Sequence, residues 1–295
     1  MVSPSSKRRA IRHCVENGLG LAAVSCRALG LARSSYYAAS RASDHSTELR
    51  QGIVELSRSK PRYGYRFITV LLRRQGRTVN FKRVQRIRRL EGLQVSKRQR
   101  RMRRLGLSSS LRQSAGYRNH IWSWDFVEDQ TENGSRFRVL TLIDEYTRRC
   151  LAVHVNRSIR AVDVMTVVEA AFQRYGRPEH LRSDNGPEFI ANAIQHWLEE
   201  RRIGTIYIRP GAPWEQAHIE SFHDKLRSEC LNREIFGSLL EARVVIEQWR
   251  CEYNQDRPHS SLKYQTPEEF AAALPPMGGT EQIINNQNQT AELHL

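Results

Sequence analysis

The sequence predicts an α/β fold in which a mixed five-stranded sheet with flanking helices follows an all-α, strongly basic region. Basic side chains are concentrated in the first 120 residues, and apolar residues recur there at helical spacing. The later chain switches to strand-like apolar runs that alternate with helix-period segments. With 295 residues, 39% of them hydrophobic, the chain is long enough for one or two domains.

Charge is divided unequally between the two halves. Residues 1–120 carry 28 basic and 5 acidic side chains, a net charge of +23, whereas residues 121–295 have a net charge of −7. A basic surface of this size indicates a polyanionic partner. We therefore expect the amino-terminal half to contact nucleic acid, with a solvated charged surface as the alternative.

Several protein classes are disfavoured. The longest apolar runs, such as Val139–Ile143, are far shorter than the roughly 20 residues of a membrane-spanning helix. The amino terminus shows no apolar signal segment. The five cysteines include no Cys-x-x-Cys pair, and the ten histidines are scattered, so we expect reduced thiols and no structural zinc site. These features predict a cytoplasmic protein with no membrane partner.

The basic half is expected to form short helices separated by glycines. One set falls within residues 7–39 and is typical of a helix-turn-helix, because two short helices flank a turn that contains glycine. A second set begins with Ser46–Ser59, continues through Phe67–Gln75, and restarts after Asn80, which we expect to be an N-cap.

The helix after Asn80, FKRVQRIRRLEG, is the most basic on one face. Its apolar residues recur at helical spacing and can pack inward while cations face outward. The outward cations are expected to be Lys82, Arg86 and Arg89, with Arg83 at the boundary. We expect these four side chains to bind DNA.

A basic linker is expected to follow this helical region. Lys97–Arg112 contains seven cations and no periodic apolar pattern, so Lys97 and Arg98 are further candidates for DNA contact. The alternative is a hinge without specific contacts. The expected domains are a helical, basic helix-turn-helix-type region at 1–96, the linker at 97–118, a catalytic core at 119–275, and a polar tail at 276–295.

The second half is expected to alternate between strands and helices. Strands are predicted at His120–Glu128, Phe137–Asp144, Arg149–Asn156, Glu179–Ser183 and Thr205–Arg209. Helices are predicted at Ala161–Tyr175, Pro187–Arg202, Ala217–Leu231 and Leu240–Asn254. Trp122 and Trp124 lie on the first strand, where core packing is the expected role.

Three acidic residues are candidates for a shared metal site. Asp125 lies in the first predicted strand, Asp184 follows the fourth, and Glu220 lies on the next helix but one. Carboxylates brought together repel one another, so such a cluster calls for neutralising cations, and two Mg²⁺ or Mn²⁺ ions would suit phosphodiester chemistry. Taken singly, each acid also has an ordinary structural explanation, as a strand acid, a turn residue or an exposed helix residue.

The local sequences around these acids resemble a known family. WSWDF, RFRVLTLIDEYTR, LRSDNGPEF, PWEQAHIESFHDKLRSECLN and YNQDRPHSSLKYQTPEEFA occur in this order. AVSCRALGLARSSYY and PRYGYRFITVLLRRQGRTVNFKRVQRIRRLEGL precede them. Together they resemble the second-reading-frame (OrfB) transposases of the bacterial insertion-sequence family numbered three, relatives of retroviral integrases. The resemblance covers roughly residues 8–273.

The resemblance implies an RNase H-like integrase core with Asp125, Asp184 and Glu220 as the catalytic, metal-binding triad for two Mg²⁺ or Mn²⁺ ions. It also implies DNA contacts by Lys225 and Arg227. Family members carry a cation seven residues after the glutamate, and seven residues are about 700° of helix, so Arg227 is expected on the side of Glu220.

The resemblance further implies an enzyme that cuts and rejoins DNA. The expected partners are the terminal inverted repeats of the element and its target DNA, a homo-multimer on that DNA, and an upstream-frame product joined by frameshifting. The expected location is the nucleoid-associated cytoplasm of a bacterium.

Three residues depart from the usual family pattern: Gln216, His223 and Asp224. They bring into question the efficiency or end preference of the reaction more than its chemistry. The alternative function is a catalytically inactive, sequence-specific DNA-binding protein that acts as a repressor. A tyrosine or serine recombinase would differ from both, since it forms a covalent protein–DNA intermediate.

Overall fold

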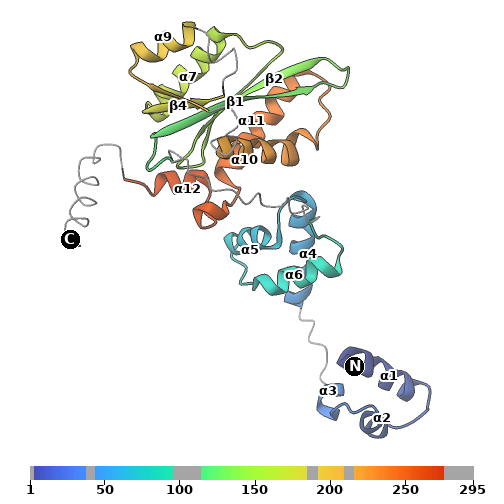
Figure 1. Ribbon diagram of the computed structural model, residues 1–295. Helices are drawn as coiled ribbons and strands as arrows, with labels where there is room; N and C mark the ends of the chain where they lie inside the picture. Colours follow the sequence, from blue (N-terminus) through green and yellow to red (C-terminus); the bar gives the residue numbers. More distant parts are fainter. Residues whose placement is uncertain (1–2, 38–43, 96–113, 185–191, 209–215, 276–295) are drawn as a thin grey trace, which may run out of the picture. The chain divides into compact units, whose positions relative to one another are not determined.

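The computed structural model describes residues 3–37, 44–95, 114–184, 192–208 and 216–275 (Figure 1). The chain divides into two compact units, Met1–Arg58 and Ser59–Leu295. Among the helices of the described ranges, none combines the length and apolarity that crossing a membrane requires. Lys97 and Arg98, which the sequence singles out for DNA contact, lie outside the described residues.

The first unit is helical. Its elements are α1 (Pro4–Glu16), α2 (Ala22–Ala28), α3 (Arg33–Tyr37) and α4 (Asp44–Ser59), the last residue of which belongs to the second unit. Ser3 caps α1 by accepting a hydrogen bond from the backbone N–H of Ser6 at 3.3 Å. Gly18, just after α1, has φ +67°, a left-handed conformation that suits glycine and ends the helix.

The second unit begins with the helix pair α5 (Tyr65–Arg74) and α6 (Phe81–Leu90). Asn80 caps α6, because its side-chain Oδ1 accepts the N–H of Lys82 at 2.9 Å, so the N-cap prediction is confirmed. Ile68 of α5 and Val84 of α6 are fully buried, as the apolar stripe predicts.

The basic face of α6 is exposed except at one position. Lys82, Arg86 and Arg89 are exposed and Arg83 is half-buried. Arg88 instead turns inward, is 3% exposed, and donates from Nη1 to the carbonyl of Tyr63 at 2.7 Å. The long aliphatic stem of arginine lets Arg88 reach a backbone acceptor inside the unit, which helical spacing alone does not reveal.

A five-stranded sheet forms the centre of the second unit (Figure 1). Its strands are β1 (Ile121–Gln130), β2 (Arg136–Asp144), β3 (Cys150–Asn156), β4 (His180–Ser183) and β5 (Gly204–Tyr207), in the spatial order β3-β2-β1-β4-β5. The first three strands pair antiparallel, and β4 pairs parallel with both β1 and β5. The mixed five-stranded sheet predicted from the sequence is confirmed.

Helices cover both faces of the sheet. The remaining elements are α7 (Ala161–Tyr175), α9 (Asn192–Glu200), α10 (Ala217–Leu226), η2 (Arg227–Leu231), α11 (Leu239–Gln255), η3 (Ser260–Leu262) and α12 (Pro267–Ala272). Trp122 and Trp124 are 0% and 1% exposed and pack with α7 and α9, which confirms their core role. On the other face, Val127 packs with α10 and α11.

The helix expected at Ala217–Leu231 changes type part of the way along. It is α-helical to Leu226, and the next five residues form a π turn in which the N–H of Asn232 donates to the carbonyl of Arg227 at 2.8 Å. A π turn contains one residue more than an α turn. The side chains after Arg227 are therefore rotated relative to a continuous α-helix.

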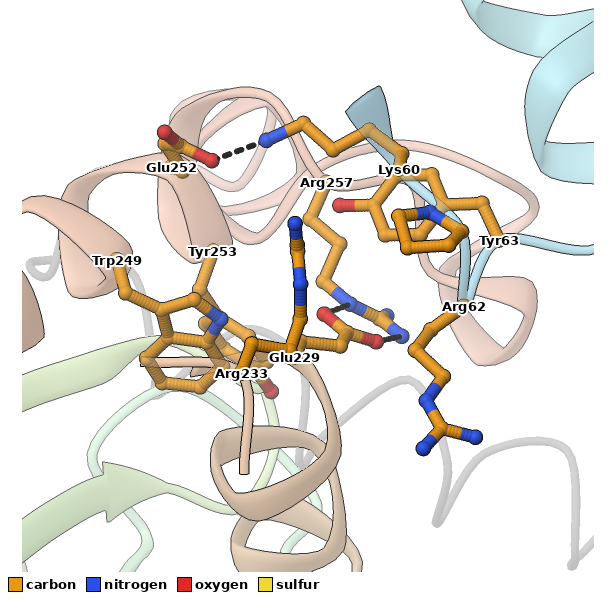
Figure 2. Close-up of a pocket in the computed structure, with 10 residues that line it drawn as sticks. Lys60, Arg62, Tyr63, Glu229, Arg233, Trp249, Glu252, Tyr253 and Arg257 are labelled. Atoms are coloured by element: carbon orange, nitrogen blue, oxygen red, sulfur yellow. Dashed lines mark hydrogen bonds and ion pairs between the residues drawn. The ribbon is translucent and has the colours of Figure 1, made fainter. Parts of the chain in front are cut away.

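Arg257 links this π turn to the start of the second unit (Figure 2). Its guanidinium donates to both carboxylate oxygens of Glu229, at 2.6 and 2.8 Å, and lies 5.5 Å from the ring centre of Tyr63. Nearby, Lys60 pairs with Glu252. The buried Arg257–Glu229 pair thus holds the π turn against the segment that precedes α5.

His259 stabilises the turn that follows α11. Its side chain is buried, and its carbonyl accepts the backbone N–H groups of Leu262 and Tyr264 at 3.0 and 2.8 Å. Burial together with the charges of Arg257 and Lys225 lowers the pKa of His259 to about 3, so the ring is neutral at pH 7.

A buried ion pair joins three segments of the sheet. Arg182 of β4 donates from Nη1 to Glu145 Oε1 and Oε2 at 2.7 and 2.8 Å, and the two side chains are 2% and 0% exposed. Ser123 of β1 also donates its hydroxyl to Glu145. A buried charge is stable only while it is paired, so each of these side chains depends on the others.

Replacing Arg182 by methionine is therefore expected to lower the free energy of unfolding by about 3–5 kcal/mol, because Glu145 is left charged and buried without its partner. Urea denaturation of both proteins measures this loss. The double variant Arg182→Met, Glu145→Gln is the control and should recover a large part of the stability. An equal loss in both variants would contradict the ion-pair explanation.

Candidate active site

The parallel pairing of β1 with β4 places Asp125 and Asp184 close together. Ser123 is the register partner of Arg182, and Asp125 and Asp184 each lie two residues further on. Side chains alternate along a strand, so these two acids share the face that α10 covers, opposite Trp124. Asp184 directly follows the last residue of β4.

Glu220 approaches from the helix that covers this face. It lies in the first turn of α10, which packs on β1, and its side chain is exposed. The negative charges of Asp184 and Glu220 both raise the pKa of Asp125. The structure thus brings the three predicted acids within electrostatic reach of one another.

Asp125 is the member of this group with a markedly perturbed pKa. Burial raises its pKa from 3.8 to about 7, and the neighbouring carboxylates add to the effect. The N–H of Phe126, which donates to Asp125 Oδ1 at 2.7 Å, and the charge of Arg138 oppose it. Near pH 7 the carboxyl of Asp125 is therefore partly protonated.

His223 lies beside Asp125, and its imidazole ring is neutral at pH 7. Its Nδ1 is 3.6 Å from Asp125 Oδ2, and its Nε2 is 2.8 Å from the hydroxyl of Thr141. Thr141 uses its only hydroxyl proton to donate to the carbonyl of Asp125 at 3.0 Å, so it accepts from Nε2–H of the imidazole. Burial and the charge of Arg227 lower the pKa of His223 to about 4, so its approach to Asp125 is not an ion pair.

The other two departures from the family pattern lie on the same helix. Gln216 is the N-cap residue of α10 and makes no side-chain capping bond, and its buried Nε2 has no hydrogen-bond partner among the described residues. Asp224 is exposed, and its charge acts against the lowering of the His223 pKa.

The two cations expected to contact DNA from this helix differ in their exposure. Arg227 is exposed at the start of the π turn. Lys225 bends back on α10 and donates from Nζ to the carbonyl and the hydroxyl of Ser221, at 2.5 and 2.6 Å. Burial, together with the charge of Arg257, lowers the pKa of Lys225 to about 8. Contact of Lys225 with DNA would require its release from Ser221.

Two groups of side chains could hold a metal ion, and the ligand atoms lie closer together in one group than in the other. Among the described residues, one group of three places its ligand atoms within 4.8 Å of one another, and it consists of His120, Glu179 and His180. Asp125, Asp184 and Glu220 do not meet this distance. Sequence spacing did not single out the first group, because His120 lies 59 residues before Glu179.

Comparison with protein families finds three matches. Residues 117–213 and 201–267 each match a description of the integrase core domain. Residues 45–101 match an HTH-like domain. The integrase matches thus cover β1, β4 and α10, the elements that position the three acids.

Proteins of insertion elements are similar over most of their length. A 31.7 kDa protein of insertion element IS407 from Burkholderia multivorans is 38% identical over 84% of this chain and 89% of its own. A 39.2 kDa protein of IS476 from Xanthomonas euvesicatoria is 38% identical over 92% and 78%. The transposase InsF of insertion sequence IS3A from Escherichia coli is 27% identical over 83% and 92%.

Solved structures of viral integrases are more distant. The HTLV-2 integrase catalytic core, solved in complex with magnesium, is 16% identical, has a TM-score of 0.40, and covers 52% of this chain and 96% of its own. The simian T-cell lymphotropic virus intasome chain is 16% identical, has a TM-score of 0.47, and covers 73% and 72%.

The family matches and the insertion-element relatives confirm the expected architecture, an RNase H-like integrase core preceded by an HTH-like helical region. They also confirm the resemblance carried by the sequence blocks. The chain belongs to the transposases of bacterial insertion elements of the family numbered three.

Proposed function

We propose that the chain is a metal-dependent DNA transposase that cuts phosphodiester bonds at the ends of its element and transfers the freed 3′-OH into target DNA. The observation that carries this proposal is the convergence of Asp125, Asp184 and Glu220 from two adjacent strands and the covering helix. The proposal assigns the catalytic role to these three carboxylates.

The donor chemistry of this group fits Mg²⁺ or Mn²⁺. All three side chains offer hard carboxylate oxygens, which these ions prefer, and their mutual repulsion favours cation uptake. Two ions held by the three acids would activate the attacking oxygen and stabilise the leaving oxygen of the phosphodiester. Because Asp125 has a pKa of about 7, cation binding competes with its proton.

The surrounding residues orient Asp125. The backbone N–H of Phe126 holds one carboxylate oxygen, and the neutral ring of His223 lies under the other. Thr141 fixes that ring and the backbone of Asp125 at the same time. These contacts restrict the rotamers of the Asp125 carboxylate.

The proposed reaction needs no covalent protein intermediate. In the first step the oxygen of water forms a bond to phosphorus, the bond from phosphorus to the 3′ oxygen breaks, and that oxygen gains a proton to leave a free 3′-OH. In the second step this hydroxyl attacks a phosphodiester of the target, loses its proton, and displaces a new 3′ oxygen.

DNA binding is proposed for the basic surfaces of the chain. The exposed cations of α6 form a cluster that can neutralise backbone phosphates, and Arg227 is exposed on the helix that carries Glu220. Lys225, Lys97 and Arg98 remain further candidates. Two element ends must be joined in one complex, so we propose a homo-multimer on DNA, formed by this chain alone or fused to the upstream-frame product.

The function is tested by Mn²⁺-dependent cleavage of labelled DNA that carries the element ends, using the chain alone and fused to the upstream-frame product. The Asp184→Asn variant should lose more than 100-fold of the cleavage rate while binding the same DNA within about twofold, because a charge needed for catalysis is removed without changing shape.

Site-specific 3′-OH ends that disappear in the variant would support the transposase. Undiminished cleavage by Asp184→Asn would contradict the triad. Binding by both the single and the fused proteins without cleavage would instead favour the alternative of an inactive, repressor-like DNA-binding protein.

The raised pKa of Asp125 predicts a pH-dependent stability. The folded chain keeps a proton on Asp125 between about pH 4 and 7 that the unfolded chain releases, so stability from this group falls as pH rises through that window. Asp125→Asn removes the effect. Relative to the native chain, the variant should gain about 1–2 kcal/mol more at pH 8 than at pH 5 in metal-free urea denaturation.

The exposed carboxylate of Glu132 provides a control for this measurement, since Glu132→Gln should change stability equally at both pH values. An equal effect of Asp125→Asn at pH 5 and pH 8 would contradict a raised pKa. Added Mn²⁺ should stabilise the native chain and not the Asp125→Asn variant.

The basic face of α6 predicts a change in the salt dependence of DNA binding. Replacing Lys82, Arg86 and Arg89 together by alanine should make the slope of log K against log salt about 2–3 units less steep, because each phosphate contact contributes about 0.9. A triple replacement of exposed cations on the core, Arg136, Arg177 and Arg233, is the matched control. Equal slopes for the two triple variants would exclude α6 as the main DNA contact.

A further inference from the structure

A second group of metal-ligating side chains lies where β1 and β4 begin. His120 immediately precedes β1, Glu179 immediately precedes β4, and His180 is the first residue of β4. The N–H of His180 donates to the carbonyl of His120 at 3.0 Å, and the N–H of Glu179 donates to that of Asn119 at 2.9 Å. The backbone therefore fixes the three residues side by side, with one ligand atom from each within 4.8 Å of the others.

We propose that His120, Glu179 and His180 form a binding site for a transition-metal ion, with Zn²⁺ as the preferred occupant. Two imidazoles and one carboxylate are a common zinc ligand set that leaves a further position for water. An ion with ligand bonds of about 2.0–2.1 Å needs its ligand atoms roughly 3.3 Å apart. Side-chain rotations that move the ligand atoms by about an ångström bring them to this spacing.

Neighbouring residues hold two of these side chains in place. Tyr117 donates its hydroxyl to Glu179 Oε1 at 2.6 Å, which orients the carboxylate and leaves its other oxygen available. The ring of Tyr117 also stacks on His120, with ring centres 4.6 Å apart and planes 10° from parallel. A hydrogen bond to a ligating carboxylate is the usual second layer of a metal site.

The third ligand occupies a space that a glycine provides. His180 is the register partner of Gly204, and a Cβ atom at Gly204 would lie 2.6 Å from Cδ2 of the imidazole. Nδ1 of His180 is buried and has no hydrogen-bond partner among the described residues. A buried imidazole nitrogen with a free lone pair is costly unless a hydrogen-bond donor or a metal satisfies it.

The imidazole of His120 lies close to the other proposed ligands, with its ring centre 5.7 Å from that of His180. Its Nδ1 accepts the N–H of Gly116 at 3.1 Å. A metal on one ring nitrogen either takes this lone pair or forces the ring proton onto it, so metal binding breaks the bond to Gly116.

This site is separate from the acidic one. Asp125 lies five positions after His120, about 16 Å along the strand, and Asp184 lies four positions after His180, about 13 Å. No ligand is shared between the two groups. A metal here would join the first residues of the two strands whose later residues carry the acids, and the proposal does not depend on the transposase function.

Zinc binding to the metal-free full chain tests the proposal, measured by calorimetry and by the visible bands of Co²⁺ as a substitute ion. One equivalent should bind, with affinity at least tenfold weaker in His120→Gln and in Glu179→Gln, and the Co²⁺ bands should disappear in both. Tyr117→Phe should weaken binding about tenfold, since it removes only the orienting hydrogen bond.

Two controls separate the site from general surface binding. His196, an exposed histidine on α9, can be replaced by glutamine and should leave the affinity unchanged. Asp184→Asn should also leave it unchanged, which separates this site from the acids. Zinc should raise the melting temperature of the native chain and not that of Glu179→Gln, whose metal-free melting temperature reports intact folding.

The amide of Gly116 provides an independent readout, because zinc should shift its NMR resonance through loss of the bond to His120. Affinities that are equal in the native chain, His120→Gln and Glu179→Gln, or the absence of any one-to-one binding, would overturn the proposal.

Discussion

The parallel pairing of β1 with β4 is the contact on which the functional face of the second unit depends. The register sets His180 beside Ile121 and Arg182 beside Ser123, and the next pair of that face is Asp125 and Asp184. A slip of one residue would turn every side chain of β4 to the opposite face. Register along these two strands therefore decides whether the acids meet at all.

Polar groups occupy this face in a row, which is unusual for the centre of a sheet. His180 lies at one end, the ion pair of Arg182 with Glu145 in the middle, and the carboxylates at the other end. Burial disfavours charge, so each group needs a partner of its own. The middle pair meets that need within the protein, whereas the two ends present ligands suited to cations.

Much of this arrangement could be predicted from the sequence, because it depends on local patterns. Asn80 before an apolar stripe marked the start of α6, and the alternation around Trp122 and Trp124 marked β1 and its buried face. The blocks around the acids identified the family. Family resemblance named the three acids, and strand pairing brings them within electrostatic reach.

Features that depend on long-range packing could not be predicted. The inward turn of Arg88 depends on a carbonyl acceptor at Tyr63, 25 residues earlier. The histidine group depends on the junction of two strand starts that lie far apart in the sequence. His223 was recognised only as a departure from a family pattern, because its contacts with Asp125 and Thr141 require β1, β2 and α10 to be in place.

The π turn after α10 divides one continuous helix into two segments, and the directions of the side chains are set separately in each segment. The facing of Glu220 is set by the α-helical part, and that of Glu229 by its bond to Arg257. Glu220 and Arg227 are joined by α-helical residues alone, since the π turn begins at Arg227. The extra residue of the π turn therefore changes the direction of the side chains that follow Arg227 and leaves the spacing from Glu220 to Arg227 that of a regular α-helix.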